Sequence, residues 1–261
     1  MSRNAPIQRM IFLHIGRTGG TTFRKEILYK SVDPSSIFLL SGSEPQVRGG
    51  TIEDLLNMAP KEQNKLRVIF GHMPFGLRDQ LACPDSWHYA TFLREPVART
   101  VSDYYQHRDK IEHPCHAQAM SYNLEEFVRA GCGLLWNGMC QWLSNAAFGK
   151  KFESSEAMYK EALRNAEACT FIGLTDFYDE SVRRLCRLCG WRLPKYEPQY
   201  SLTPRDRILS LPEREILHAH SVFDRALYQH FHDRFLQQPQ EKSSLLESLT
   251  YVLKQLSSLS K

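Results

Sequence analysis

The chain has 261 residues, of which 42% are hydrophobic and 24% are charged. These values are those of an ordinary soluble globular protein with ample core, either one α/β domain or one domain with appendages. The formal charge of +4 suits an anionic ligand but is too small to predict nucleic-acid binding by itself.

The N-terminal region shows no pattern of a secretory leader. Its first apolar run is short, begins at residue 10 and has no cleavage pattern. No stretch approaches the roughly 18 apolar residues that a membrane-spanning helix needs. The seven cysteines are odd in number and scattered, which favours a reducing compartment over a disulfide framework. We therefore expect a cytoplasmic protein.

The first structured segment is residues 9–30, RMIFLHIGRTGGTTFRKEILYK. Its apolar run predicts a buried strand, the glycine-rich stretch a tight loop, and the spacing of the following apolar residues a helix with Thr21 or Thr22 as N-cap. Such an arrangement directs backbone N–H groups at an anion such as phosphate or sulfate. A glycine turn that merely joins strand to helix is the alternative. The Walker A pattern is missing, because no Lys precedes Thr21 or Thr22.

Three further strands are predicted at residues 37–40, 66–70 and 87–93. Between the first two of these lie a polar loop over residues 44–50 and a short capped helix over residues 51–58. A helix is predicted from Pro96 onward, since proline suits the first helical turn. Strands alternating with helices at these spacings predict a parallel sheet covered on both faces.

Polar side chains follow three of these strands at their carboxyl ends, where ligands bind in such sheets. The strand that begins at residue 10 is followed by the loop from Arg17 to Thr22, the strand over residues 66–70 by His72, and the strand over residues 87–93 by Arg94. We therefore expect them to converge. Ser102 lies two helical turns beyond Pro96, and an Arg fork with a hydroxyl suits a second phosphate. A surface pair of Arg94 with a neighbouring carboxylate, Glu95 or Asp103, is the alternative.

Five segments of the chain, in order, resemble the carbohydrate sulfotransferases, in particular the 2-O-sulfotransferase branch. HIGRTGGTTF resembles the family's 5′-phosphosulfate loop, and LREPVARTVSDYY its 3′-phosphate motif, an Arg followed eight positions later by a Ser. GHMPFG resembles the segment that carries the catalytic histidine. FIGLTDFYDESVRRLCRLCGW and SVFDRALYQHF resemble later segments, so that the similarity spans roughly residues 9–233.

The resemblance implies a P-loop-like three-layer α/β/α fold with a mainly parallel central sheet. It also implies transfer of a sulfuryl group from 3′-phosphoadenosine 5′-phosphosulfate (PAPS) to an acceptor hydroxyl, with the bisphosphate PAP as product and no metal. His72 would be the general base and Arg17 the stabiliser of the leaving phosphate. The residues expected to hold the donor are Arg17, Thr18, Gly19, Gly20, Thr21, Thr22, Arg94, Ser102, Asn137, Ser201 and Arg205.

Two departures from the family pattern stand in the first loop. Gly16 replaces the usual Pro, which is conformationally harmless, and Arg17 replaces the usual Lys. An Arg keeps its charge permanently and donates through a fork, so it cannot serve as a proton donor. A nucleoside-phosphate-binding module without transfer activity is therefore an alternative function, and a kinase-like phosphotransferase is a second one. The missing Lys and the lack of an evident Mg²⁺-binding Asp disfavour the kinase.

Two groups of side chains resemble metal or redox motifs. His113, Cys115 and His116 are spaced too tightly for a normal zinc site, and the segment is interpreted as a solvated loop. Cys186 and Cys189 form a C-x-x-C pattern inside a predicted helix, where small apolar core residues are the better interpretation.

The chain is divided into a sulfotransferase domain over residues 1–236 and an amphipathic helical tail over residues 237–261. In the tail, apolar residues alternate four and three apart at Leu245, Leu249, Val252, Leu256 and Leu259. Two such heptads are too short for a stable free coiled coil. Docking on the domain is favoured over homodimerisation or another partner. The acceptor is expected to be a glycan or a small alcohol, and no nucleic acid is expected to bind.

Overall fold

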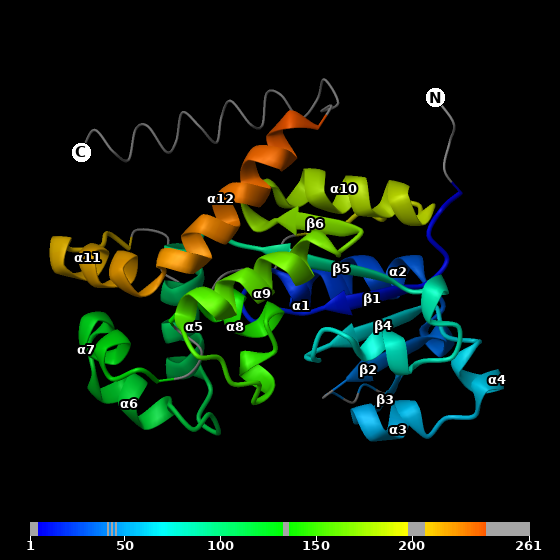
Figure 1. The fold of residues 1–261 in the computed structure, drawn as a ribbon, viewed down its shortest axis with the longest axis horizontal. Coiled ribbons are helices and arrows are strands. Elements are labelled where there is room, and N and C mark those ends of the chain that lie inside the picture. The colour runs from blue at the N-terminus through cyan, green and yellow to red at the C-terminus, as the bar shows by residue number, and fades with distance from the viewer. Residues whose placement is uncertain are drawn as a thin grey trace.

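A computed structural model describes residues 5–40, 42, 44, 46–132, 136–197 and 207–238. Its centre is a six-stranded sheet in the order β3-β2-β4-β1-β5-β6, and every strand pair is parallel (Figure 1). The strands are β1 Met10–Leu13, β2 Ile37–Leu40, β3 Arg48–Gly50, β4 Val68–Gly71, β5 His88–Leu93 and β6 Phe171–Leu174. The predicted parallel α/β sheet is confirmed.

Helices connect and cover the strands. The α-helices are α1 Gly20–Thr22, α2 Tyr29–Ser31, α3 Ile52–Leu56, α4 Pro60–Gln63, α5 Pro96–Asp109, α6 His116–Ser121, α7 Leu124–Arg129, α8 Gly138–Leu143, α9 Ser155–Glu167, α10 Tyr178–Cys189, α11 Leu211–His220 and α12 Val222–Gln237. A π-helical segment, Phe23–Leu28, joins α1 to α2, so that residues 20–31 form one continuous helical stretch. Short 3₁₀ turns are Pro34–Ser36, Leu77–Gln80, Pro84–Ser86, Ala146–Phe148 and Thr175–Phe177.

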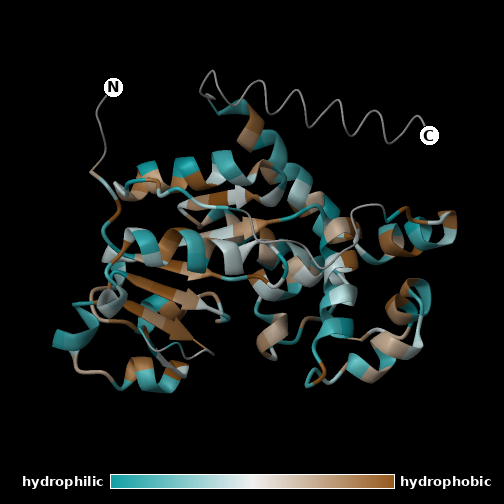
Figure 2. Cartoon of the chain, turned by 180° about the vertical axis from the view of Figure 1, so that it is seen from behind, coloured by the Kyte–Doolittle hydropathy of each residue, from teal (hydrophilic) through white to brown (hydrophobic). Residues whose placement is uncertain are grey.

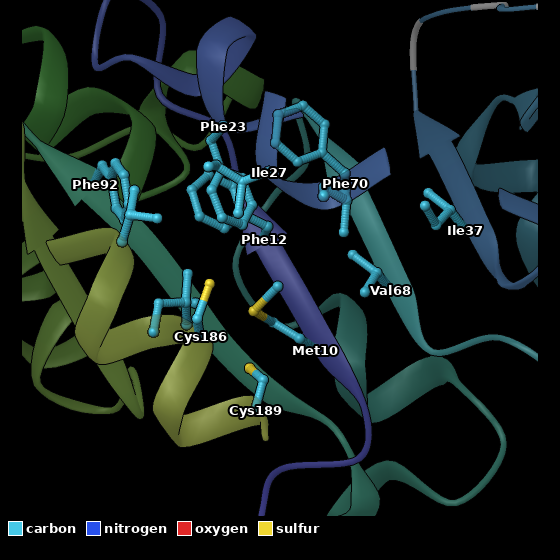
Figure 3. Packing of buried hydrophobic residues seen from close by; sticks show 14 of the residues in the cluster. Met10, Phe12, Phe23, Ile27, Ile37, Val68, Phe70, Phe92, Cys186 and Cys189 are labelled. Carbon is cyan, nitrogen blue, oxygen red and sulfur yellow. The ribbon is translucent and has the colours of Figure 1, made fainter. Parts of the chain in front are cut away.

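Strands β1, β2 and β4 are buried on both faces, because their side chains alternate between two apolar clusters. Met10 and Phe12 of β1 pack on one face against Phe23 and Ile27 of the first helical stretch and against α10 (Figure 3). The β1 residues between and after them join the opposite face, which α3 covers through Leu55. Figure 2 shows that the strands consist mainly of apolar residues, whereas the helices carry both apolar and polar residues. The result is a P-loop-like three-layer α/β/α fold.

Cys186 and Cys189 lie in α10 with 2% and 6% of their surface exposed and belong to the first of these clusters. The interpretation of the C-x-x-C pattern as core packing is confirmed. None of the seven cysteines, all of which lie in the described residues, forms a disulfide. In the parts of the chain that the structure describes, no helix is both long and apolar enough to cross a membrane.

Two local predictions are wrong. Gly19, not Thr21 or Thr22, is the N-cap of the first helix, because its φ of 79° ends the loop in a left-handed conformation that glycine adopts without strain. Strand β3 lies in the segment predicted as a polar loop. Its sequence Arg-Gly-Gly carries no strand preference, and it is held as an edge strand by pairing Phe38 with Arg48.

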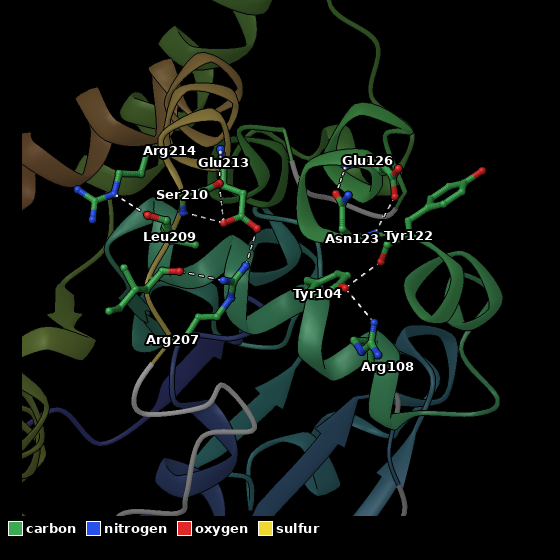
Figure 4. Close-up of polar contacts among 11 residues, drawn as sticks. Tyr104, Arg108, Tyr122, Asn123, Glu126, Arg207, Leu209, Ser210, Glu213 and Arg214 are labelled. Carbon is green, nitrogen blue, oxygen red and sulfur yellow. Dashed lines mark hydrogen bonds and ion pairs between the residues drawn. The ribbon is translucent and has the colours of Figure 1, made fainter.

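Other local signals are confirmed. Thr51 and Asp54 form the capping box that opens α3, and Pro96 stands in the first turn of α5. A further capping box, Ser210 with Glu213, opens α11 and is drawn in Figure 4. The tail over residues 239–261, with its predicted heptads, lies outside the described residues.

Candidate active site

The carboxyl ends of the three middle strands meet at one edge of the sheet. Leu13 at the end of β1 pairs with Gly71 of β4 and with Thr91 of β5. Three segments therefore begin side by side at this edge. They are the loop that follows β1, the segment with His72 that follows β4, and the segment with Arg94 that follows β5. The predicted convergence of these segments is confirmed.

His72 is held through one ring nitrogen, and the other has no hydrogen bond to the residues that the structure describes. Its Nδ1 lies 2.6 Å from the carbonyl oxygen of His14. Because a carbonyl can only accept, Nδ1 carries the proton, and the lone pair of the neutral ring is on Nε2. The ring also stacks on the His14 ring, with centroids 4.8 Å apart, and lies 4.7 Å from the ring centroid of Trp142 in α8.

The environment of His72 favours the neutral imidazole. Burial lowers its pKa from the usual 6.5, and the hydrogen bond to the His14 carbonyl, which favours the charged ring, offsets only part of this effect. The pKa of His14 is lowered further, by its own burial and then by the neighbouring His72 ring. A neutral His72 at neutral pH is the state that a general base requires.

Arg17 lies in a strained and strongly tethered conformation. Its φ is 69°, a left-handed value that costs a non-glycine residue about 1–2 kcal/mol. Its Nε and Nη2 donate to the Ser102 hydroxyl at 3.0 and 2.8 Å, and its Nη1 donates to Gln106 on the next turn of α5. Arg94 Nη1 in turn donates to the Arg17 carbonyl at 3.1 Å.

The loop itself wraps closely around the start of the first helical stretch. The Thr18 hydroxyl is buried and donates to the Ile15 carbonyl at 2.8 Å, so only its backbone amide remains for a ligand. Thr21 is exposed and Thr22 is buried. A Cβ on Gly20 would lie 2.1 Å from the His14 ring, so this close approach requires glycine. The loop and His14 are thus packed as one unit.

The two residues predicted for a second phosphate lie close together, and their phosphate contact stays a prediction. Arg94 and Ser102 both reach Arg17, and Ser102 has no exposed surface. Burial lowers the pKa of Arg94, and the nearby Asp176 carboxylate counteracts part of that effect. The alternative, a surface pair of Arg94 with Glu95 or Asp103, is not among the ion pairs of the described residues. The Glu95 carboxylate accepts from two α5 backbone amides as the N-cap, and the Asp103 carboxylate faces Arg99 and His107.

Asn137 has a clear structural task. Its Oδ1 accepts from the backbone N–H groups of Phe223 and Asp224 at 2.9 and 3.1 Å, at the start of α12. Asp224 accepts in turn from the amides of Met139 and Cys140. The contact of Asn137 with an adenine remains a prediction. Ser201 and Arg205 lie outside the described residues.

Three side chains of the site were not predicted from sequence: His14, Gln106 and Trp142. Two of them had a local signal. His14 stands two residues before Gly16 of the glycine loop, and Gln106 stands four residues after Ser102 on the same face of α5. Nothing in the spacing of Trp142 along the chain connects it with His72.

The chain was compared with protein families, curated sequences and solved structures. No protein-family model and no curated protein sequence matches the chain. Among solved structures, the fold is similar to that of a structure described as a sulfotransferase from Alicyclobacillus acidocaldarius. The similarity covers 88% of this chain and 96% of that chain at 15% sequence identity, with a TM-score of 0.43. An overlap of this size assigns no role to any residue.

Proposed function

We propose that the protein is a sulfotransferase that moves a sulfuryl group from PAPS to an acceptor hydroxyl. The observation that carries the proposal is the meeting of three groups at one sheet edge: His72 with its free Nε2, the glycine loop with Arg17, and Arg94 with Ser102. A base, a phosphate-binding loop and a second cationic phosphate contact are what this transfer needs. The motif order along the chain supports the same function.

In the proposed reaction the acceptor oxygen attacks sulfur while the bond from sulfur to the 5′-phosphate oxygen breaks. The acceptor proton passes to His72 Nε2, and the leaving phosphate takes the negative charge. Arg17 and the loop amides up to Thr22 stabilise that charge. Arg94 and Ser102 hold the 3′-phosphate and distinguish PAPS from ATP. The scheme assigns no step to a metal.

The structure adds one requirement to this scheme. The Ser102 hydroxyl is buried and bonded to the Arg17 guanidinium. We infer that donor binding turns Arg17 away from Ser102, so that the guanidinium faces the leaving group and the hydroxyl faces the 3′-phosphate. The acceptor belongs to the class of glycan or small-molecule alcohols, and we propose a cytoplasmic location.

The identity of the donor is tested by thermal stabilisation of the purified protein. PAP is expected to raise the melting temperature more than ADP with Mg²⁺ does, because Arg94 and Ser102 meet a 3′-phosphate that ADP lacks. Sulfate transfer from labelled PAPS to a panel of glycans and alcohols then tests catalysis. A preference for ADP would favour the kinase-like alternative. Stabilisation by PAP without any transfer would favour the non-catalytic binding module.

Arg17 should respond unequally to two substitutions. Arg17→Ala is expected to remove most of the turnover, since the leaving phosphate loses its cationic partner. Arg17→Lys is expected to keep or raise turnover, because a lysine keeps the charge and cannot bond Ser102 and Gln106 together as the guanidinium fork does. The measurement is kcat with PAPS for both variants.

Gln106→Ala serves as the matched variant for the tethering of Arg17. Removing the Gln106 acceptor leaves the charge of Arg17 intact, so turnover should stay far above that of Arg17→Ala. If Arg17→Ala is as active as the parent protein, Arg17 has no role at the leaving group.

A further inference from the structure

Three potential metal ligands gather at the carboxyl end of α5. They are His107 in the last turns of that helix, and His113 and Cys115 in the loop that leads to α6. One ligand atom from each lies within 4.8 Å of the other two. The sequence had grouped His116 with the last two. In the structure, however, His116 Nδ1 lies 2.9 Å from the His107 carbonyl oxygen, and the helix supplies His107 instead.

His107 has a buried ring nitrogen that lacks a partner. Its side chain is 5% exposed, and its Nδ1 has no hydrogen bond among the described residues. A buried polar atom without a partner costs roughly 1–3 kcal/mol, and a bound ion would remove this cost. The other nitrogen, Nε2, lies 3.8 Å from Asp103 Oδ1. This separation is longer than a hydrogen bond, and a small shift of Asp103 would give the carboxylate support that a metal-binding imidazole usually has.

The loop ligands lie against this ring from the solvent side. The His113 ring stacks on the His107 ring with centroids 3.9 Å apart, and both loop residues are partly exposed, so that an ion can reach them. His113 Nδ1 accepts from the Cys115 backbone N–H at 3.1 Å. An ion would take over this lone pair, and the amide would turn to solvent.

The helix side of the cluster is fixed in place. Arg108, next to His107, donates to the Tyr104 hydroxyl and to the Ala119 carbonyl, both at 2.9 Å. The Tyr104 hydroxyl donates to the Tyr122 carbonyl at 2.9 Å (Figure 4). These bonds tie α5 to α6 and to the turn after it. The adjustment to a metal therefore falls on the loop over residues 110–115.

We propose that His107, His113 and Cys115 form a binding site for Zn²⁺. Two imidazoles and a thiolate are a ligand set that zinc prefers, with a water completing the tetrahedron. Tetrahedral bonds of about 2.0–2.3 Å place ligand atoms roughly 3.3–3.7 Å apart, so the loop closes by about 1 Å on binding. The Cys115 thiol releases its proton to solvent when the ion binds. The filled site joins the loop to the helix turn that carries Gln106, the partner of Arg17.

The site is tested on the full-length protein after chelator treatment. Zn²⁺ is titrated against a chromogenic chelator, and Co²⁺ serves as the spectroscopic probe, since a thiolate-to-cobalt charge-transfer band reports Cys115 as a ligand. The expected result is one ion per chain with that band. Cys115→Ser should abolish the band. Both Cys115→Ser and His113→Asn should lower the zinc affinity by roughly a hundredfold or more, which exceeds the usual loss when only a hydrogen-bond partner of a metal ligand is removed.

Two variants control for unspecific binding. Cys83→Ser removes an exposed cysteine elsewhere, and His218→Asn an exposed histidine of α11. Both should bind zinc as the parent protein does. Both ligand variants replace partly exposed loop side chains, and circular dichroism checks that they are folded. Lack of stoichiometric zinc binding by the parent, a cobalt complex without the thiolate band, or equal losses in the control variants would each overturn the proposal.

Discussion

Replacing His72 with asparagine is expected to lower turnover by about 10²–10⁴-fold, the usual contribution of a general base. Asparagine keeps an N–H near the position of Nδ1, which can still meet the His14 carbonyl, but it has no basic nitrogen at the position of Nε2. Binding of PAP should stay nearly unchanged, because the proposed donor contacts come from the loop, Arg94 and Ser102. The measurements are kcat with PAPS and the dissociation constant of PAP on one purified variant.

The pH profile of the parent protein provides a second measurement. A general base acts in its neutral form, so activity should fall as the pH decreases through the pKa of His72. Since burial lowers that pKa from 6.5, the acidic limb should have its midpoint below 6.5, not in the ordinary histidine range. This limb should disappear in any residual activity of His72→Asn.

The exposed His218 offers a matched control. His218→Asn should keep both the turnover and the acidic limb of the parent. If His72→Asn loses PAP binding together with turnover, His72 is a structural residue and the base lies elsewhere. Unchanged turnover would remove His72 from the chemistry.

Replacing Arg94 with alanine is expected to weaken PAP binding by about ten- to a hundredfold. This corresponds to the roughly 1.5–3 kcal/mol of a charge-assisted hydrogen bond. Adenosine 5′-phosphosulfate, which lacks the 3′-phosphate, should lose much less affinity. Some loss of affinity for adenosine 5′-phosphosulfate is still expected, because Arg94 also donates to the Arg17 carbonyl and so stabilises the loop. The informative quantity is the ratio of the two losses, measured by calorimetry.

Arg129 is the matched control for this experiment, since it is an arginine paired with Glu125 on the surface of α7. Arg129→Ala should leave the affinity for both nucleotides unchanged. Equal losses for both nucleotides in Arg94→Ala would mean that Arg94 acts only through the loop, and the 3′-phosphate would then bind elsewhere.

Much of the candidate site followed from local signals in the sequence. Strand ends and helix starts are marked by three local features. These are the apolar run before the glycine loop, the glycine after residues 68–70 and the proline after Glu95. Because parallel strands place their carboxyl ends at one edge, three such marks predicted one site. The pairing of Leu13 with Gly71 and Thr91 confirms that these strand ends meet at one edge, while the roles of the residues there stay predictions.

Contacts between distant residues could not be predicted in this way. Gly19 rather than a threonine begins the first helix, in a loop packed on Tyr178, whose hydroxyl donates to the Gly19 carbonyl at 3.1 Å. Strand β3 exists only because β2 offers an unpaired edge. Likewise, His107 joins His113 and Cys115 only because the chain turns back after α5.

The sequence by itself determined the class of fold, the place of the glycine loop and the identity of His72, Arg94 and Ser102 as residues at one sheet edge. These depend on hydrophobic periodicity and on turn residues, which act over a few positions. Only the tertiary structure decided that His14 orients His72, that Arg17 is tethered to Ser102 and Gln106, and that Asn137 accepts from the first-turn amides of α12. Each of these depends on a hydrogen bond across the fold, whose partners are chosen by packing and not by the residues beside them in the chain.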